Sequence, residues 1–160
     1  MAEHHFTPET FYNTIGSHEP ALYIKDGDTV MTSTLDAHGG DRDGTKKAPR
    51  SNPMTGPIYV EGAEPGDALM VTFESIVPNR DWGWAADVFI PNLVDPDFAA
   101  KLPTRGRRFW QIDAEKGTAW INDPQPSIGQ ATLPLSPFVG CFGVAPPGGQ
   151  AISTSTSGPH

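Results

Sequence analysis

Apolar residues recur at every second position in several short stretches of this chain, and turn-forming residues separate the stretches. In residues 68–76, Leu69, Val71 and Phe73 alternate with mostly less apolar neighbours, which is the two-residue period of a half-buried strand. A β-rich run at residues 58–60 lies just upstream, so residues 61–67 are predicted to be a hairpin connection. Further short strands are predicted at residues 29–35, 109–113, 118–121, 138–144 and 150–154.

Two segments depart from this pattern. Near the start, Thr7 can cap a helix, Pro8 suits the first helical position and Gly16 can end the turn, so one short helix is predicted there. Residues 79–108 break the rhythm of strands with tryptophans and prolines, and they are predicted to form a long excursion with little regular structure. Long loops in compact domains are usually functional or form an interface.

Glycine and proline punctuate the whole chain, with 17 of each among 160 residues. Together they make up a far larger share than the average of about 12%. Long helices do not survive such punctuation, because proline removes a backbone donor and glycine costs backbone entropy. The composition therefore predicts a mainly β fold of short strands and long loops, with at most one or two short helices. The length predicts a single domain over residues 1–160.

The charge balance restricts the partners. With 11 basic and 19 acidic residues, the formal net charge is −8, which disfavours nucleic acid and anionic membrane surfaces. No apolar run approaches the roughly 20 residues of a membrane span, and the N-terminus lacks a secretory pattern, so a cytoplasmic location is expected. The single cysteine, Cys141, lies among apolar residues and is predicted to be a small buried hydrophobe.

Asp36 and His38 are the first candidates for chemistry, because they follow a predicted strand within a glycine-rich stretch. Two residues apart at a strand end, the carboxylate and the imidazole point to the same side. They supply a hard oxygen and a borderline nitrogen, a usable pair of ligands for zinc or a similar divalent ion. An Asp-capped surface turn explains the same residues, since two ligands do not make a site.

Residues 52–67 combine turn signals with carboxylates at unusual density. A bent loop can aim the amide of Asn52 or the hydroxyl of Thr55 at a substrate, although both are also good turn formers. Glu61 is a candidate general base if a pocket raises its pKa, and solvation of the loop is its simpler role. His160 is a further candidate, with an unimportant terminal residue as the alternative.

The same stretch carries a resemblance to a known family. Residues 52–67, read NPMTGPIYVEGAEPGD, closely resemble the acetamidase/formamidase family, which is rich in the phrase TGP-(I/F)-YVEGAEPGD. Residues 28–36, read DTVMTSTLD, and residues 137–152, read PFVGCFGVAPPGGQAI, are similar to the family as well. Residues 154–160, read TSTSGPH, look like the run that continues in the family into a Gly-Gly-Asn-x-Asp segment.

The resemblance implies a jelly-roll-like β-sandwich that hydrolyses small linear amides, formamide or acetamide, to the carboxylate and ammonia. A metal-assisted route fits this reaction, because a divalent ion lowers the pKa of a coordinated water to about 7 and polarises the amide oxygen. Asp36, His38 and His160 are then the expected ligands, and zinc is the expected ion. Glu61 or a carboxylate outside this chain is expected to carry a proton to the leaving ammonia, and Asn52 and Thr55 are expected to act beside it.

Members of the family look like much longer chains, so this chain is expected to be their N-terminal half. It is then expected to need a C-terminal half or a companion chain, and to form a homo-oligomer. The alternative is a non-catalytic β-sandwich module for binding or interaction, derived from the same family. The long excursion at residues 79–108, with its tryptophans, suits an interface in that alternative.

Overall fold

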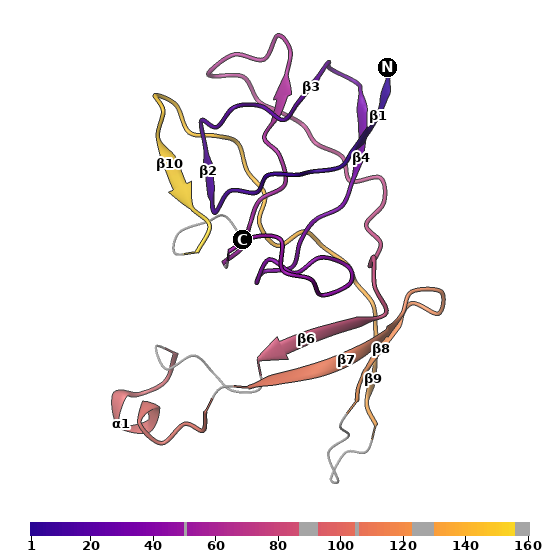
Figure 1. Cartoon of the computed structure of the whole chain (residues 1–160), viewed down its shortest axis with the longest axis vertical. Coiled ribbons are helices and arrows are strands. Elements are labelled where there is room, and N and C mark those ends of the chain that lie inside the picture. The colour runs from indigo at the N-terminus through magenta and orange to yellow at the C-terminus, as the bar shows by residue number, and fades with distance from the viewer. Residues whose placement is uncertain (50, 87–92, 105, 123–129, 156–160) are drawn as a thin grey trace. The chain divides into compact units, whose positions relative to one another are not determined.

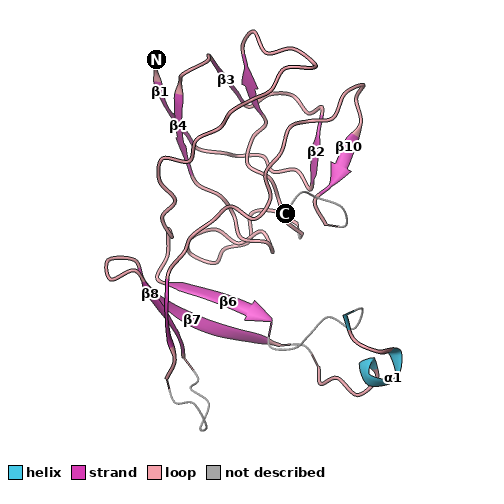
Figure 2. Cartoon of the chain, turned by 180° about the vertical axis from the view of Figure 1, so that it is seen from behind, coloured by secondary structure: helices cyan, strands magenta, loops and turns pink. Residues whose placement is uncertain are grey.

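The computed structural model describes residues 1–49, 51–86, 93–104, 106–122 and 130–155. Short strands dominate the described chain, together with one short helix (Figures 1 and 2). In chain order the elements are β1 (Glu3–Phe6), β2 (Thr14–Gly16), β3 (Leu22–Ile24), β4 (Thr29–Thr32), β5 (Ile58–Val60), β6 (Trp82–Ala86), α1 (Pro96–Ala99), β7 (Arg107–Asp113), β8 (Thr118–Ile121), β9 (Thr132–Pro134) and β10 (Ala151–Ser153). The prediction of a mainly β fold with at most one or two short helices is confirmed. In the described part of the chain, no helix is long and apolar enough to cross a membrane.

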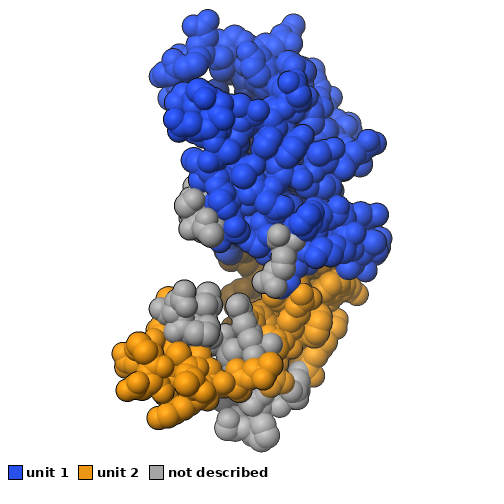
Figure 3. Space-filling view, turned by 60° about the vertical axis from the view of Figure 1, so that its left-hand side comes forward, with its two compact units in different colours: residues 1–75, 138–160 blue, residues 76–137 orange. Residues whose placement is uncertain are grey.

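The chain divides into two compact units (Figure 3). Unit 1 contains Met1–Ser75 and Phe138–His160, and unit 2 contains Ile76–Pro137. Unit 2 is therefore inserted, in sequence, between the two parts of unit 1. The single domain expected over residues 1–160 stays a prediction.

Unit 1 is built from three two-stranded ladders. β1 pairs with β4 and β3 pairs with β5 in parallel, whereas β2 and β10 pair in antiparallel register, with Ile15 opposite Ile152. Among its described residues the buried apolar side chains are few, namely Ile15, Ala48 and Pro53, and Thr154 is fully buried. Because so little apolar surface is buried, hydrogen bonds between segments that are remote in sequence determine much of the structure of this unit.

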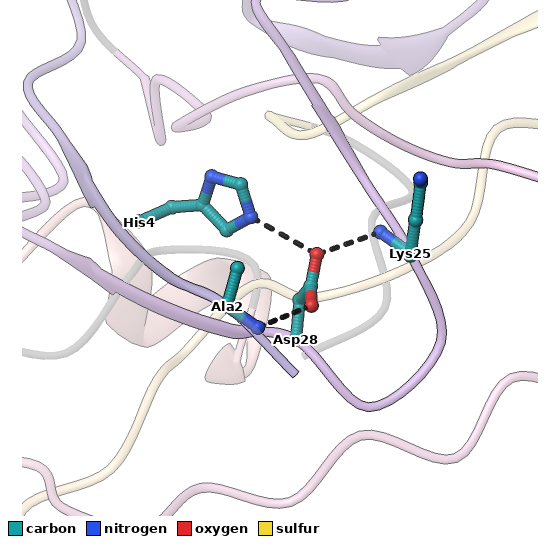
Figure 4. Close-up of polar contacts among 4 residues, drawn as sticks. All are labelled: Ala2, His4, Lys25 and Asp28. Carbon is teal, nitrogen blue, oxygen red and sulfur yellow. Dashed lines mark hydrogen bonds and ion pairs between the residues drawn. The ribbon is translucent and has the colours of Figure 1, made fainter.

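Asp28 ties β1 to the turn before β4 (Figure 4). One carboxylate oxygen accepts from the backbone amide of Ala2 at 2.7 Å, and the other accepts from the amide of Lys25 at 3.0 Å. The same second oxygen lies 3.0 Å from Nε2 of His4. The two backbone donors, followed by the His4 contact, hold the pKa of the Asp28 carboxyl well below its usual range.

Unit 2 is a four-stranded antiparallel sheet in the order β6-β7-β8-β9. The predicted hairpin between residues 109–113 and 118–121 is confirmed as β7–β8. In its turn, Asp113 accepts from the Lys116 amide at 2.9 Å and from Lys116 Nζ at 2.7 Å, while Gly117 adopts a φ of +63°. The Lys116 side chain, together with its amide, lowers the pKa of Asp113. Local turn chemistry thus fixes this hairpin.

Several local predictions are wrong. The helix expected from Thr7 to Gly16 is absent, because the described backbone there contains β2 and a bridge between Tyr12 and Met54 instead. The hairpin expected across residues 61–67 does not form, since β5 pairs in parallel with β3. The long excursion over residues 79–108 contains β6 and α1, and β6 pairs with β7.

The strands expected at residues 68–76 and 138–144 are not strands in the described structure. The apolar alternation of Leu69, Val71 and Phe73 is present in the sequence, but residues 68–75 make no backbone hydrogen bond with any described residue. The strands expected at residues 29–35, 58–60 and 150–154 are confirmed as β4, β5 and β10, with β4 and β10 shorter than predicted.

Candidate functional site

Asp36 organises a tight turn directly after β4. Its Oδ1 atom accepts hydrogen bonds of 2.9 Å from the backbone amides of both His38 and Gly40. Its own amide donates to the carbonyl of Gly40 at 2.9 Å, and its carbonyl accepts from the amide of Gly39 at 2.8 Å. Two hydrogen bonds therefore fix the direction of this carboxylate, and two more close the backbone of the turn.

Glycine is required at position 39 of this turn, and a side chain at position 40 would be tightly accommodated. Gly39 has a φ of +82°, and a Cβ atom placed there would lie 2.1 Å from the carbonyl oxygen of Ala48. A Cβ atom on Gly40 would lie 3.0 Å from Oδ2 of Asp36. The two glycines thus allow the buried Ala48 segment and the carboxylate to approach closely.

A second turn of the same kind follows immediately. Oδ1 of Asp41 accepts from the amides of Asp43 at 3.0 Å and Thr45 at 2.8 Å. Its Oδ2 lies 3.7 Å from Nζ of Lys47, and the amide of Lys47 returns to the carbonyl of Gly39 at 2.8 Å. Residues 36–48 consequently form a compact loop held by two aspartates.

The segment of residues 52–55 lies alongside the strand end that leads into this loop. The backbone amide of Asn52 donates to the carbonyl of Ala37 at 2.8 Å, and the Thr55 hydroxyl donates to the carbonyl of Ser33 at 3.4 Å. Asp36, His38, Asn52 and Thr55 therefore lie on two cross-bonded segments, although they were selected from separate stretches of the sequence. We call this assembly, residues 33–40 with residues 52–55, the Asp36 platform.

Hydrogen bonds around the buried Thr154 join the platform to the N-terminal and C-terminal parts of unit 1. The side-chain amide of Asn52 donates to the Thr154 carbonyl at 2.7 Å, and the buried Thr154 hydroxyl donates to the Asn52 carbonyl at 2.8 Å. Asn13 completes the junction, since its side chain donates to the Ser51 carbonyl at 2.6 Å and its carbonyl accepts from the Thr154 amide at 3.1 Å. Asn52 takes a φ of +50° to make these contacts.

Glu61 and His160 are the two remaining predicted site residues. Glu61 is exposed and follows β5, which ends on the opposite side of unit 1 from the loop of residues 36–48 (Figure 1). Its amide donates to the Ile24 carbonyl at 2.7 Å. His160 lies outside the described residues.

The donor set of the platform suits a divalent cation in part. Asp36 and His38 offer a carboxylate oxygen and an imidazole nitrogen from one turn, which are ordinary zinc ligands. Within the described ranges, no group of three or more His, Cys, Asp and Glu side chains could hold a metal ion. The third predicted ligand, His160, belongs to the residues that are not described.

Sequence reasoning missed Asn13 and Thr154. Neither belongs to a periodic pattern or to a motif with known ligand spacing, and each works through backbone carbonyls far away in the sequence. Their one signal is residue type, because Asn and Thr side chains bond readily to backbone groups. Cys141 is half-buried, and burial raises the pKa of its thiol, in keeping with the predicted hydrophobic role.

Fold and site together define a mainly β protein that presents a carboxylate, an imidazole and an amide on cross-bonded loops. This chain belongs to the Acetamidase/Formamidase family, whose pattern matches residues 15–153. A protein of Schizosaccharomyces pombe that bears the name "Putative formamidase" is 33% identical over 72 residues, which are 39% of this chain and 18% of that protein. The match thus spans less than a fifth of the relative's length. No solved structure matches this chain.

Proposed function

We propose that this chain takes part in the hydrolysis of a short linear amide, such as formamide or acetamide, to the carboxylate and ammonia. Membership of the family supports amide hydrolysis as the reaction class. The geometry of the Asp36 platform supports that part of unit 1 as the place of the reaction. The observation that carries the proposal is the hydrogen bond from the backbone amide of Asn52 to the Ala37 carbonyl. This bond joins the Asp36 turn to the segment of Asn52 and Thr55.

The reaction needs a water oxygen to bond to the amide carbon while the carbon–nitrogen bond breaks. The nitrogen must gain a proton before it leaves as ammonia. Charge develops on the amide oxygen during the attack, so fixed polar groups of known direction are most useful there. The Asp36 carboxylate has such a fixed direction, because two backbone amides hold its Oδ1 atom.

Asn52 is suited to orient the substrate. Its Nδ2 group is engaged with the Thr154 carbonyl, and no hydrogen bond to its Oδ1 atom is formed within the described residues. We propose that this oxygen accepts a hydrogen bond from the NH₂ group of the amide substrate. The Thr55 hydroxyl, whose bond to Ser33 is long at 3.4 Å, is proposed to donate to the substrate.

We propose a divalent ion, with zinc as the leading candidate, held by Asp36 and His38 and by His160. Such an ion supplies a water of lowered pKa and polarises the carbonyl. The chain's own contribution is to keep the Asp36 carboxylate and the His38 imidazole on one turn that the glycines Gly39 and Gly40 keep tight. A cytoplasmic location and a homo-oligomer remain part of this proposal.

The proton carrier is proposed to come from outside this chain. Glu61 was one candidate, but it follows a strand that ends away from the Asp36 platform (Figure 1), so it is not assigned a step. The remaining candidate is a carboxylate of a C-terminal half or companion chain. Because the matched relative extends far beyond the match, we propose that activity requires that additional polypeptide.

The test is ammonia release from formamide and from acetamide by the protein purified from its native source, with any companion chain identified by intact mass. Release that stops on chelation and returns with zinc is the expected result. Activity that ignores the chelator would remove the metal and keep the amidase. No release from any short amide would favour the alternative, a non-catalytic interaction module, which family membership alone does not favour.

A further inference from the structure

Two segments of unit 1 that lie outside its sheets expose apolar side chains. Residues 68–75 carry Leu69, Met70, Val71 and Phe73, all exposed, with Met70 at 94% of its full accessibility. Residues 138–144 carry exposed Phe138, Phe142 and Val144. We call the surface made by these two segments the open-strand surface.

The two segments of the open-strand surface lie side by side. The rings of Phe73 and Phe142 make an edge-to-face contact, with their centroids 5.4 Å apart and their planes at 70°. Both side chains still remain about half exposed, at 51% for Phe73 and 47% for Phe142. The aromatic pair therefore joins the segments and leaves apolar area open to solvent. Exposed apolar patches of this kind mark interaction sites.

The backbone groups of residues 68–75 also have no hydrogen-bonding partner among the described residues. Leu69, Val71 and Phe73 nevertheless alternate as in a strand. A segment with free amides and carbonyls and an alternating apolar pattern can serve as a template for the addition of another strand.

The charges around this surface indicate the kind of strand that fits. Glu64, Asp67 and Glu74 are exposed, and neither residues 61–75 nor residues 138–144 contain a lysine or arginine. Two copies of this surface would place carboxylates opposite carboxylates, and like charges opposite one another destabilise a sheet. The matching strand is therefore apolar in alternation and basic at its flanks, and it comes from a polypeptide other than a second copy.

We propose that residues 68–75 bind a β-strand of a partner polypeptide by strand addition, with basic flanks of that strand beside Glu64, Asp67 and Glu74. The apolar side chains of the added strand cover Val71, Phe73 and Phe142. The proposal is independent of amide hydrolysis, because it concerns the backbone of one open segment and not the Asp36 platform.

The experiment uses the whole chain and a synthetic peptide of sequence KTVTVTVK, which has alternating valines and a lysine at each end. Hydrogen exchange read by mass spectrometry is expected to show fast exchange at residues 68–75 alone and slow exchange there at saturating peptide. A peptide of scrambled sequence is the control for composition. Equal protection with both peptides, or no protection with either, overturns the proposal.

Three variants test the mode of binding. Val71→Pro removes one amide donor from an exposed segment, and it is expected to weaken peptide binding about tenfold, as the loss of one hydrogen bond does. Val71→Thr keeps both the donor and the branched side chain, and it is expected to bind within about twofold of the parent. Because the amides of successive strand residues face opposite edges, Thr72→Pro is measured beside Val71→Pro, and unchanged affinity with both variants overturns strand addition. Protection of the same amides on raising the protein concentration alone makes a second copy the occupant, and it also overturns the proposal.

Discussion

Asn52 and Thr154 form a reciprocal pair of hydrogen bonds across 102 positions of sequence, each side chain donating to the other residue's backbone carbonyl, at 2.7 and 2.8 Å. Thr154 is fully buried, and Asn52 is partly buried. A buried donor or acceptor that loses its partner costs more than the bond itself contributes. The pair therefore fixes how the two chain parts of unit 1 meet beside the Asp36 platform.

Replacing the Thr154 hydroxyl is expected to destabilise the protein. Thr154→Val keeps the shape but leaves the Asn52 carbonyl without that donor, and a loss of about 1–3 kcal/mol in the free energy of unfolding is expected. Thr154→Ser keeps the hydroxyl and should lose less. Urea unfolding of the two variants measures the difference. Equal stability of the two variants would contradict a role for the hydrogen bond.

The backbone of Asn52 predicts a second, separate effect. Its φ of +50° is costly for residues that have a Cβ, other than Asn and Asp, and free for glycine. Asn52→Gly and Asn52→Ala lose the same side-chain bond to Thr154, but only alanine meets the backbone penalty. Alanine is expected to be less stable than glycine by about 1 kcal/mol. Thermal unfolding of the matched pair checks the sign, and a more stable alanine variant would falsify the argument.

Gly39 predicts a large effect from a single methyl group. In Gly39→Ala the new Cβ would clash with the Ala48 carbonyl at 2.1 Å, in addition to a φ of +82°. Gly62→Ala is the matched control, because its φ is +84° and no atom lies within 4 Å of the added carbon. We expect Gly62→Ala to cost about 1 kcal/mol, and Gly39→Ala to cost a further 1–3 kcal/mol or so. Similar unfolding midpoints would show that the loop is not tightly packed.

Asp28 predicts a dependence of stability on pH. Its pKa is lowered in the folded protein by the amides of Ala2 and Lys25 and by His4, so its contribution is fully present above the unfolded pKa of about 3.9. That contribution is lost as the pH falls below this value toward the folded pKa. Because Asp28→Asn has no carboxylate at this position, its stability should not show this decrease at acidic pH. Unfolding midpoints of the parent and of Asp28→Asn, measured from about pH 6 down to about pH 2, test this prediction.

The control for this titration is Asp26→Asn, at an exposed neighbour in the same turn. It removes one carboxylate from the turn and leaves the hydrogen bonds of Asp28 in place. If Asp28→Asn shows the same pH dependence as Asp26→Asn, the hydrogen bonds to Asp28 contribute nothing to the acid sensitivity.

Asp36 provides the prediction for activity. Asp36→Asn keeps an Oδ1 acceptor for the amides of His38 and Gly40, so the turn should fold, but it removes the charge needed by a cation. Ammonia release by the complete protein is expected to fall by at least 10–100-fold or so, the loss that follows even from changes to groups behind metal ligands. Asp43→Asn, in the same loop and exposed, should leave release unchanged. Retained activity in Asp36→Asn would remove Asp36 from the site.

Local chemistry was the part of the fold that could be predicted from the sequence. The β7–β8 hairpin follows from Asp113, Lys116 and Gly117, which lie within a few positions of each other. The helix expected from Thr7 failed because Tyr12 and Asn13 bond to residues about 40 positions away instead of to their neighbours. A capping residue and a proline favour a helix only until remote partners compete for the same backbone.

The candidate site was predictable as a set of residue types and not as an arrangement. The turn at Asp36 follows from its neighbouring glycines, and the sequence already offered that interpretation beside a ligand role. The cross-bonding of Ala37 to Asn52, and of Asn52 to Thr154, has no periodic signal, because each bond involves a backbone carbonyl that every residue type possesses. The metal, the amide substrate and the role of His160 stay predictions.

The interrupted order of unit 1 has a consequence for biosynthesis. β2 cannot pair with β10 until the ribosome has translated all of Ile76–Pro137 and then Ala151–Ser153. At about 5–20 residues per second, the nascent N-terminal part waits on the order of ten seconds with Ile15 and Asn52 lacking their final neighbours. During that interval unit 2 can complete its own sheet, whereas the β2–β10 ladder of unit 1 has to form afterwards.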